Sequence, residues 1–176
     1  MPPHCDSMDG PVVRAAIKAL EGEDVNLILP YVHREGEPEV TQAFEKVIQV
    51  RKNGALTREL ADRYFFETVV RVHRAGEGAA YTGLKPAGLD VGPVIPVAEK
   101  AIEAGSAEEL VELLCGAVRE QVHHRFKHML HLKRHASEGV DQSREYVESM
   151  LGLQVWSHSL YECSRSEPHS GHHEHA

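Results

Sequence analysis

Three consecutive residues near the N-terminus carry side chains that commonly bind metal ions. In the stretch MPPHCDSMDGP, His4, Cys5 and Asp6 offer an imidazole, a thiolate and a carboxylate, a mixture that suits Ni, Cu, Zn or Fe. Because one short peptide rarely completes a coordination shell, further ligands must come from elsewhere in the chain or from backbone nitrogens. The triplet therefore predicts a transition-metal site in the N-terminal hook, defined here as residues 1–9. The alternative is a segment that only packs onto the first helix.

Two side chains of one predicted helix are candidates for the further ligands. Glu67 lies in the apolar run YFFETVVRV, where a carboxylate either points outward or is buried and paired with Arg63 or Arg71, one turn away. His73 ends the same helix and could serve as a ligand or as an acid/base. The alternative for His73 is a histidine favoured at that position by the helix dipole. The predicted metal ligands are thus His4, Cys5, Asp6, Glu67 and His73.

Other histidines offer more exposed metal-binding surfaces. A stripe of four, spaced 4, 3 and 4 residues apart, shares one side of a predicted helix, and we expect it to lie opposite that helix's core face, in solvent. The stripe consists of His124, His128, His131 and His135. The predicted core face consists of Val118, Val122, Phe126 and Met129. Such histidine pairs bind Zn or Ni adventitiously. The tail PHSGHHEHA is of low complexity and is expected to be disordered.

Helices are expected to position all of these residues. Apolar side chains recur every three or four positions, and no stretch alternates with period two, which predicts an all-α helical bundle. Pro11 and Gly22 are typical of the two ends of a first helix. Ser106 and Glu109 form the capping-box pattern that is typical of the start of another helix.

The sequence also contains a weak internal repeat. A shift of 82 positions places DGPVVRAAIKALE on VGPVIPVAEKAIE without a gap and aligns helix starts, caps and aromatic residues. We interpret this as a duplication of a four-helix unit; the alternative is two unrelated amphipathic runs in chance register. The predicted parts are the hook (1–9), the first repeat (10–76), a Gly-rich connector (77–91), the second repeat (92–162) and a disordered His-rich tail (163–176). The triplet has no counterpart before the second repeat.

The amino-acid composition argues against two classes of binding partner. The formal net charge of −8 argues against nucleic acid and anionic membranes, because both require a basic face. The sequence contains no run of about 18 apolar residues, so we expect no membrane-spanning helix. The N-terminus shows no signal peptide, so we expect a cytoplasmic protein whose three cysteines stay reduced.

Most of the chain resembles a family of helical prokaryotic proteins of unknown function. The resembling stretches are HCDSMDGPVV, LADRYFFETVVRVHRAGEGAAYTGLKPAGLDVGPVIP and REYVE. In many members the His-Cys-Asp triplet directly follows a signal peptide, so the resemblance implies a histidine that becomes the mature N-terminus. This chain departs from that pattern because it starts with MPP. The resemblance implies no particular activity.

A second, local resemblance concerns the hook alone. HCD followed by a turn and a proline is similar to the N-terminal hook of nickel superoxide dismutase, itself a helical bundle. The resemblance implies a metal held by the first histidine with its amine, the next residue's amide and two cysteines. His4 and Cys5 match the first two positions, whereas Met8 or Asp9 stands where the second cysteine is expected. Two thiolates bring nickel into redox range, and this hook supplies one.

These observations favour a homo-oligomeric helical protein that binds a transition-metal ion. As an enzyme, it would carry out a metal-centred redox reaction on a small molecule at the hook. Two non-catalytic alternatives stay open. One is a metal storage or chaperone protein that loads ions on the histidine stripe and the tail. The other is an oligomeric helical scaffold in which Cys5 is simply buried.

Overall fold

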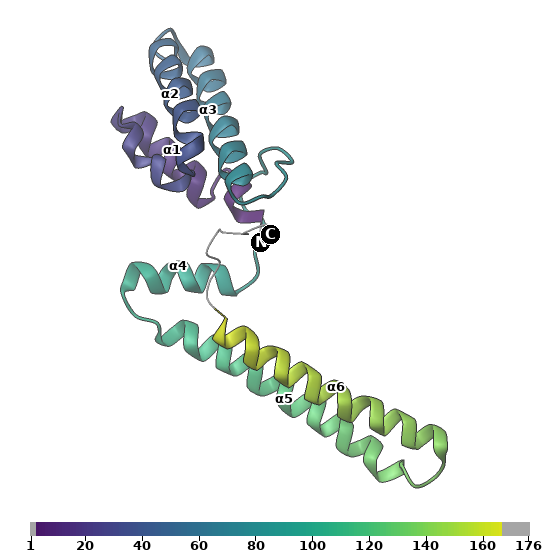
Figure 1. Ribbon diagram of the computed structural model, residues 1–176. Helices are drawn as coiled ribbons and strands as arrows, with labels where there is room; N and C mark the ends of the chain where they lie inside the picture. The colour runs from purple at the N-terminus through teal and green to yellow at the C-terminus, as the bar shows by residue number, and fades with distance from the viewer. Residues whose placement is uncertain (1–2, 167–176) are drawn as a thin grey trace. The chain divides into compact units, whose positions relative to one another are not determined.

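The computed structural model describes residues 3–166, which form an all-α structure without strands, as predicted (Figure 1). The α-helices are α1 (Pro11–Gly22), α2 (Glu37–Val50), α3 (Ala55–Gly76), α4 (Val94–Ala104), α5 (Glu108–His135) and α6 (Val140–Arg165). Short 3-10 helices are η1 (Pro3–Asp6), η2 (Val25–Leu27), η3 (Leu29–Tyr31) and η4 (Arg34–Gly36). None of the helices in this part of the chain has the length and apolarity needed to cross a membrane. The chain divides between Gly92 and Pro93 into two compact units, which are described separately.

In the first unit, α1, α2 and α3 pack around one hydrophobic core. Each helix turns an apolar stripe inward because its apolar residues recur at helical spacing. Phe65 of α3 is fully buried, and its ring centroid lies 5.7 Å from that of Phe44 of α2. Burying one such ring contributes roughly 1.5–3 kcal/mol to the stability of the fold. The first unit therefore has a core of its own.

A polar contact fixes α1 against the other two helices. The Arg51 guanidinium, directly after α2, donates to both carboxylate oxygens of Asp62 on α3, at 2.7 and 2.9 Å. It also donates to the carbonyl oxygen of Leu20 at 2.6 Å. This carbonyl lies in the last turn of α1, where helical carbonyls have no partner within the helix. Arg51 thus satisfies the end of α1 while holding α2 and α3 together.

In the second unit, α5 and α6 form a long antiparallel hairpin, and α4 contacts α5. Among the described residues of this unit, only Met129 is buried. Arg125 of α5 stacks over Trp156 of α6, with its guanidinium carbon 4.6 Å from the ring centroid. The hairpin therefore buries little apolar surface within one chain.

The predicted core face of α5 is only partly right. Met129 is buried and Val118 half-buried, as expected, but Val122 and Phe126 are exposed. On this side of α5 the cover comes partly from Arg125, which stacks over Trp156 of α6, and Val122 and Phe126 keep 39% and 47% of their surface exposed.

Each unit contains three α-helices rather than the predicted four. Under the 82-residue shift, α1 and α4 coincide to within one residue, and α3 and α6 overlap. The two units differ in the segment that follows α1 or α4. Residues 24–36, which include Pro30, form η2, η3 and η4, whereas most of the matching residues 106–118 belong to α5. The internal duplication stays a prediction.

Candidate functional site

The hook is a compact turn held by its own backbone. Ser7 donates to the carbonyl oxygen of His4 twice, from its amide at 3.2 Å and from its hydroxyl at 2.8 Å. Gly10 then donates its amide to the carbonyl oxygen of Ser7 at 2.9 Å. A Cβ atom at Gly10 would lie 1.9 Å from the carbonyl oxygen of His4, so only glycine fits here. The Gly-Pro start of α1 is therefore also what closes the hook.

The connector lies directly against the hook. Lys85 accepts from the amide of Met8 at 3.0 Å and donates its own amide to the carbonyl oxygen of Asp6 at 2.8 Å, an isolated parallel bridge between Ser7 and Lys85. The Asp9 carboxylate accepts from the amide of Gly88 at 2.8 Å. This hydrogen bond, followed by one from the Ser7 side chain, lowers the pKa of Asp9. The connector thus belongs structurally to the hook rather than merely linking two units.

The carboxylate of Asp6 is bound to a buried arginine. Nε of Arg74, near the end of α3, donates to Asp6 Oδ1 at 2.5 Å, and only 5% and 6% of the Asp6 and Arg74 side chains is exposed. The hydrogen bond that Arg74 donates to Asp6 raises the pKa of Arg74, against the opposing effect of burial. Because a buried charge is costly unless it is paired, each side chain requires the other.

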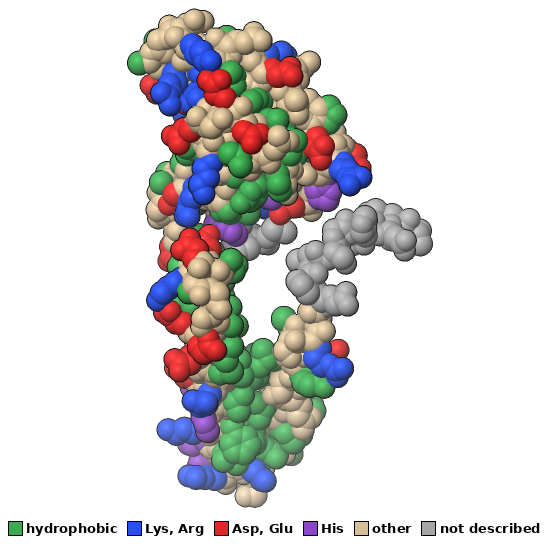
Figure 2. Space-filling model, turned by 90° about the vertical axis from the view of Figure 1, so that its left-hand side faces the viewer, with side chains coloured by type: hydrophobic (Ala, Val, Ile, Leu, Met, Phe, Trp, Pro, Cys, Tyr) green, Lys and Arg blue, Asp and Glu red, His purple; other side chains and the backbone are tan. Residues whose placement is uncertain are grey.

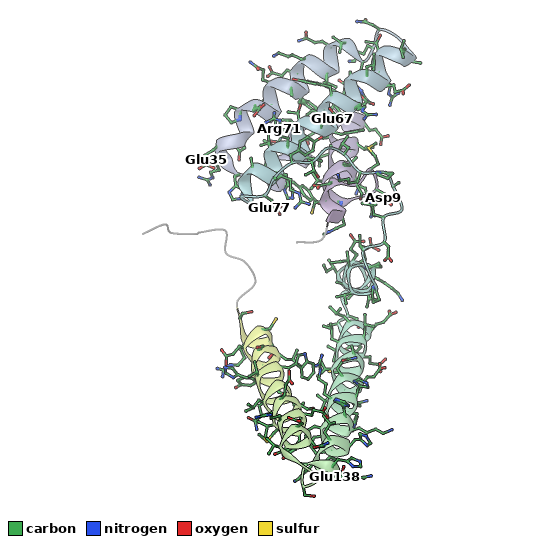
Figure 3. All side chains as sticks on the ribbon, turned by 90° about the vertical axis from the view of Figure 1, so that its right-hand side faces the viewer. Asp9, Glu35, Glu67, Arg71, Glu77 and Glu138 are labelled. Carbon is green, nitrogen blue, oxygen red and sulfur yellow. The ribbon has the colours of Figure 1, made fainter. Side chains whose placement is uncertain are left out.

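His73 is connected to the hook through two intermediate side chains. Arg74 also donates to Glu77 Oε2 at 3.2 Å, and Glu77 Oε1 lies 3.3 Å from His73 Nε2 (Glu77 is labelled in Figure 3). The His73 Nδ1 atom lies 2.7 Å from the carbonyl oxygen of Tyr31, which can only accept, so Nδ1 carries the proton. A chain of polar contacts therefore runs from Asp6 through α3 to η3.

His4 and Cys5 lie next to each other on η1. The Nε2 atom of His4 is 3.9 Å from Cys5 Sγ, and the thiol is buried. Nδ1 of His4 is also buried and has no hydrogen-bond partner among residues 3–166. The charge of Cys5 contributes to raising the pKa of Arg74, so the sulfur lies within electrostatic reach of that guanidinium. The hook thus places one ring nitrogen and one sulfur atom close together, beside a buried arginine.

Glu67 points outward, which is the first of the two alternatives stated for it. Its carboxylate is 44% exposed and lies 3.1 Å from Nε of Arg63. Its charge nevertheless acts on Tyr81 in the connector. Burial is the main cause that raises the pKa of Tyr81, the charge of Glu67 is the second, and the charge of Asp6 has a weaker effect. Tyr81 packs against the core of the first unit and lies within the electrostatic range of both carboxylates.

The structure brings the five predicted ligands together only in part. His4 and Cys5 are adjacent, Asp6 and His73 are linked through Arg74 and Glu77, and Glu67 stands apart. Across residues 3–166, no group of three or more His, Cys, Asp or Glu side chains is arranged to hold a metal ion.

The histidine stripe lies in the second unit, and two of its four members line a groove between α5 and α6. His124 and His128 line it from α5, and Glu145 and Glu148 line it from α6. The tail from residue 167 onward, which was predicted as a metal-loading surface, lies outside the described residues.

Comparison with known proteins places the chain in a family without assigning a reaction. The model named "Family of unknown function (DUF6448)" matches residues 9–156. The chain belongs to this family. The expected membership of a helical family of unknown function is thus confirmed for this DUF6448 protein. His4, Cys5 and Asp6 lie outside the matched range, which begins three residues after Asp6. No curated protein and no solved structure matches the chain.

Sequence reasoning missed three residues of the site in this DUF6448 chain: Arg74, Glu77 and Tyr81. The spacing of Arg74 and His73 to Glu77, three and four residues, is a usable signal, because side chains at this spacing meet on a helix. No local pattern could have paired Arg74 with Asp6, which lies 68 residues away.

Proposed function

We propose that the hook binds one transition-metal ion through His4 and Cys5, and that the protein acts on a small molecule at that ion. The distance of 3.9 Å between His4 Nε2 and Cys5 Sγ carries the proposal. Metal bonds of about 2.0–2.1 Å to nitrogen and 2.3 Å to sulfur separate the two ligand atoms by about 3.6 Å at a tetrahedral angle. The two side chains therefore need to move by only a few tenths of an ångström to share one ion.

The chemistry of the donor pair supports a transition metal rather than a hard cation. Imidazole suits Zn, Cu, Fe and Ni, and a thiolate selects soft or borderline ions over Mg²⁺ and Ca²⁺. His4 Nδ1 has no hydrogen-bond partner among the described residues, and Nε2 faces Cys5 Sγ, so no other protein group competes with an ion for the imidazole there. In this proposal the ion is Ni, Cu, Fe or Zn.

Asp6 has a supporting part in this proposal rather than a place in the coordination shell. Its Oδ1 atom accepts from buried Arg74, so the carboxylate fixes η1 against α3 and holds His4 and Cys5 in place. His73 contacts the Tyr31 carbonyl oxygen and the Glu77 carboxylate, and Glu67 forms an ion pair with Arg63. These three predicted ligands thus help to build the surroundings of the ion.

Two protein ligands leave coordination positions for other molecules. Structural zinc sites are closed by four protein ligands, whereas catalytic sites keep a position for water or substrate. A hook that supplies one nitrogen and one sulfur therefore fits an ion that exchanges small ligands. This is why we favour action on a small molecule over a purely structural ion.

The test is a cobalt titration of the untagged full-length protein under reducing conditions. A thiolate ligand gives Co²⁺ a near-ultraviolet charge-transfer band, which histidines alone do not produce. We expect the band in the wild type and in Cys115→Ala, and its loss in Cys5→Ala. A band that survives in Cys5→Ala, or its absence from the wild type, would overturn the proposal.

A further inference from the structure

Three buried side-chain atoms have no hydrogen-bond partner within residues 3–166, and all three belong to the hook or to segments bonded to it. They are His4 Nδ1, His73 Nε2 and the hydroxyl of Tyr81. The first belongs to the proposed metal pair, and the second faces the Glu77 carboxylate at 3.3 Å. Because a buried polar group without a partner destabilises a fold, the hydroxyl of Tyr81 requires an explanation.

The connector folds Tyr81 back toward the hook. Gly83 has a φ of +91°, a conformation that suits glycine, and it turns the chain between Tyr81 and Leu84. The amide of Leu84 is close enough to the Tyr81 oxygen to lower the pKa of Tyr81, against the larger effect of burial, which raises it. An amide N–H can only donate, so the hydroxyl proton has no acceptor there. Lys85, the next residue, donates its amide to the carbonyl oxygen of Asp6 at 2.8 Å.

The charged groups around Tyr81 also connect it with the hook. Burial is the main cause that raises its pKa, and the charges of Glu67 and Asp6 add to the effect, so both carboxylates lie within electrostatic range. The Tyr81 side chain packs against the core cluster that contains Cys5. Figure 2 shows acidic side chains next to histidines at one end of the first unit. In these surroundings the phenol keeps its proton at neutral pH and is a hydrogen-bond donor.

We propose that the Tyr81 hydroxyl donates a hydrogen bond to the small molecule that binds at the hook, and that this molecule carries an oxygen or nitrogen atom that accepts it. The inference rests on the proposed function, because His4 and Cys5 supply two ligands and leave positions for an exchangeable molecule. A purely apolar molecule would leave the hydroxyl without a partner. A donor at this place also stabilises negative charge on the bound molecule.

A role in ligand binding and a role in holding the fold predict different effects of one variant, Tyr81→Phe. Removing a hydroxyl that is hydrogen-bonded within the protein lowers stability. Removing a hydroxyl whose partner is a bound molecule weakens the binding of that molecule and leaves the metal-free fold intact. The two properties are measured separately below.

The first experiment titrates azide into the cobalt-loaded, untagged full-length protein under reducing conditions and follows the visible cobalt bands. Azide is a small anion that binds metal ions through a nitrogen atom and accepts hydrogen bonds. We expect Tyr81→Phe to keep the thiolate band described above and to raise the azide dissociation constant about tenfold. Tyr64→Phe is the matched control, because Tyr64 on α3 is 51% exposed, and it should bind azide as the wild type does.

The outcomes separate this inference from the proposed function. A wild type without the thiolate band overturns the proposed function and this inference with it. An intact band with equal azide affinity in Tyr81→Phe and the wild type overturns this inference alone, as does a cobalt-loaded wild type that binds no azide.

The second experiment unfolds the metal-free proteins with urea and follows circular dichroism at neutral pH. The unfolding midpoint of Tyr81→Phe should equal or exceed that of the wild type, because the variant removes a buried hydroxyl that has no partner in the described part of the chain. A clearly lower midpoint would mean that the hydroxyl is bonded within the fold, which overturns the assignment of its proton to a bound molecule.

Discussion

Arg74 and Asp6 form a buried ion pair 2.5 Å long that joins the end of α3 to the hook, across 68 residues of sequence. Arg74 reaches Glu77 with a second nitrogen, so one guanidinium organises two carboxylates. Since both members of the pair are shielded from solvent, its contribution differs from that of the exposed pair Arg63–Glu67.

Removing one partner of the buried pair should destabilise the first unit strongly. We expect Arg74→Ala to lower the free energy of unfolding by about 3–5 kcal/mol, because it leaves the Asp6 carboxylate buried without its cation. The measurement is urea unfolding followed by circular dichroism. Arg63→Ala is the matched control and should cost at most about 1 kcal/mol. Equal effects of the two variants would show that the Asp6–Arg74 pair is solvated.

Gly10 should tolerate no side chain. We expect Gly10→Ala to cost about 1–3 kcal/mol, because its Cβ would collide with the carbonyl oxygen of His4 and open the hook. Cobalt binding should weaken in the same variant. Gly116→Ala on α5 is the control: its Cβ meets nothing within 4 Å, and alanine favours the helix by about 0.5–1 kcal/mol. A stable, cobalt-binding Gly10→Ala variant would contradict the described closure of the hook.

Asp9 should make the hook sensitive to acid. Its folded pKa lies below the ordinary value of 3.8, chiefly because the amide of Gly88 donates to the carboxylate. The stabilisation is therefore present above that value and is lost as pH falls through the folded pKa. Asp9→Asn should flatten this part of the curve of stability against pH. The measurement is urea unfolding at a series of acidic pH values, and an unchanged curve would argue against the Asp9–Gly88 contact.

Tyr81 should be the tyrosine that is hardest to ionise among those described. Burial raises its pKa above 10.0, and the charge of Glu67 adds to the effect. Stability linked to this group is thus present below that value and declines as pH rises through the folded pKa. In a phenolate absorbance titration, Tyr81→Phe should remove the last component, and Glu67→Gln should move it to lower pH. An unmoved component in Glu67→Gln would place the two side chains out of electrostatic range.

The sequence predicts the helices well because their signals are local. Pro11 and Gly22 are the first and last residues of α1, and proline suits the first position because its fixed φ is helical. The left-handed position that favours glycine is occupied by Glu23. Residues 24–36 are harder to predict, since Pro30 interrupts a run whose apolar spacing alone would fit a helix.

The candidate site is only partly predictable, because its contacts join distant residues. The adjacency of His4 and Cys5 is visible in the sequence, but the pairing of Asp6 with Arg74 and of Ser7 with Lys85 depends on the fold. On α5, helical periodicity places Phe126 on the predicted core face, but its side chain is exposed in the structure.

The bridge between Ser7 and Lys85 also sets the order in which the site can assemble. During synthesis the ribosome releases the hook first, yet Asp6 and Met8 find their backbone partner only after the chain has grown past Lys85. The first unit is thus closed by its last segment, a contact of high sequence separation that forms late. Until then the hook lacks the backbone contacts to Lys85, so Cys5 of a nascent chain is open to solvent before it is enclosed.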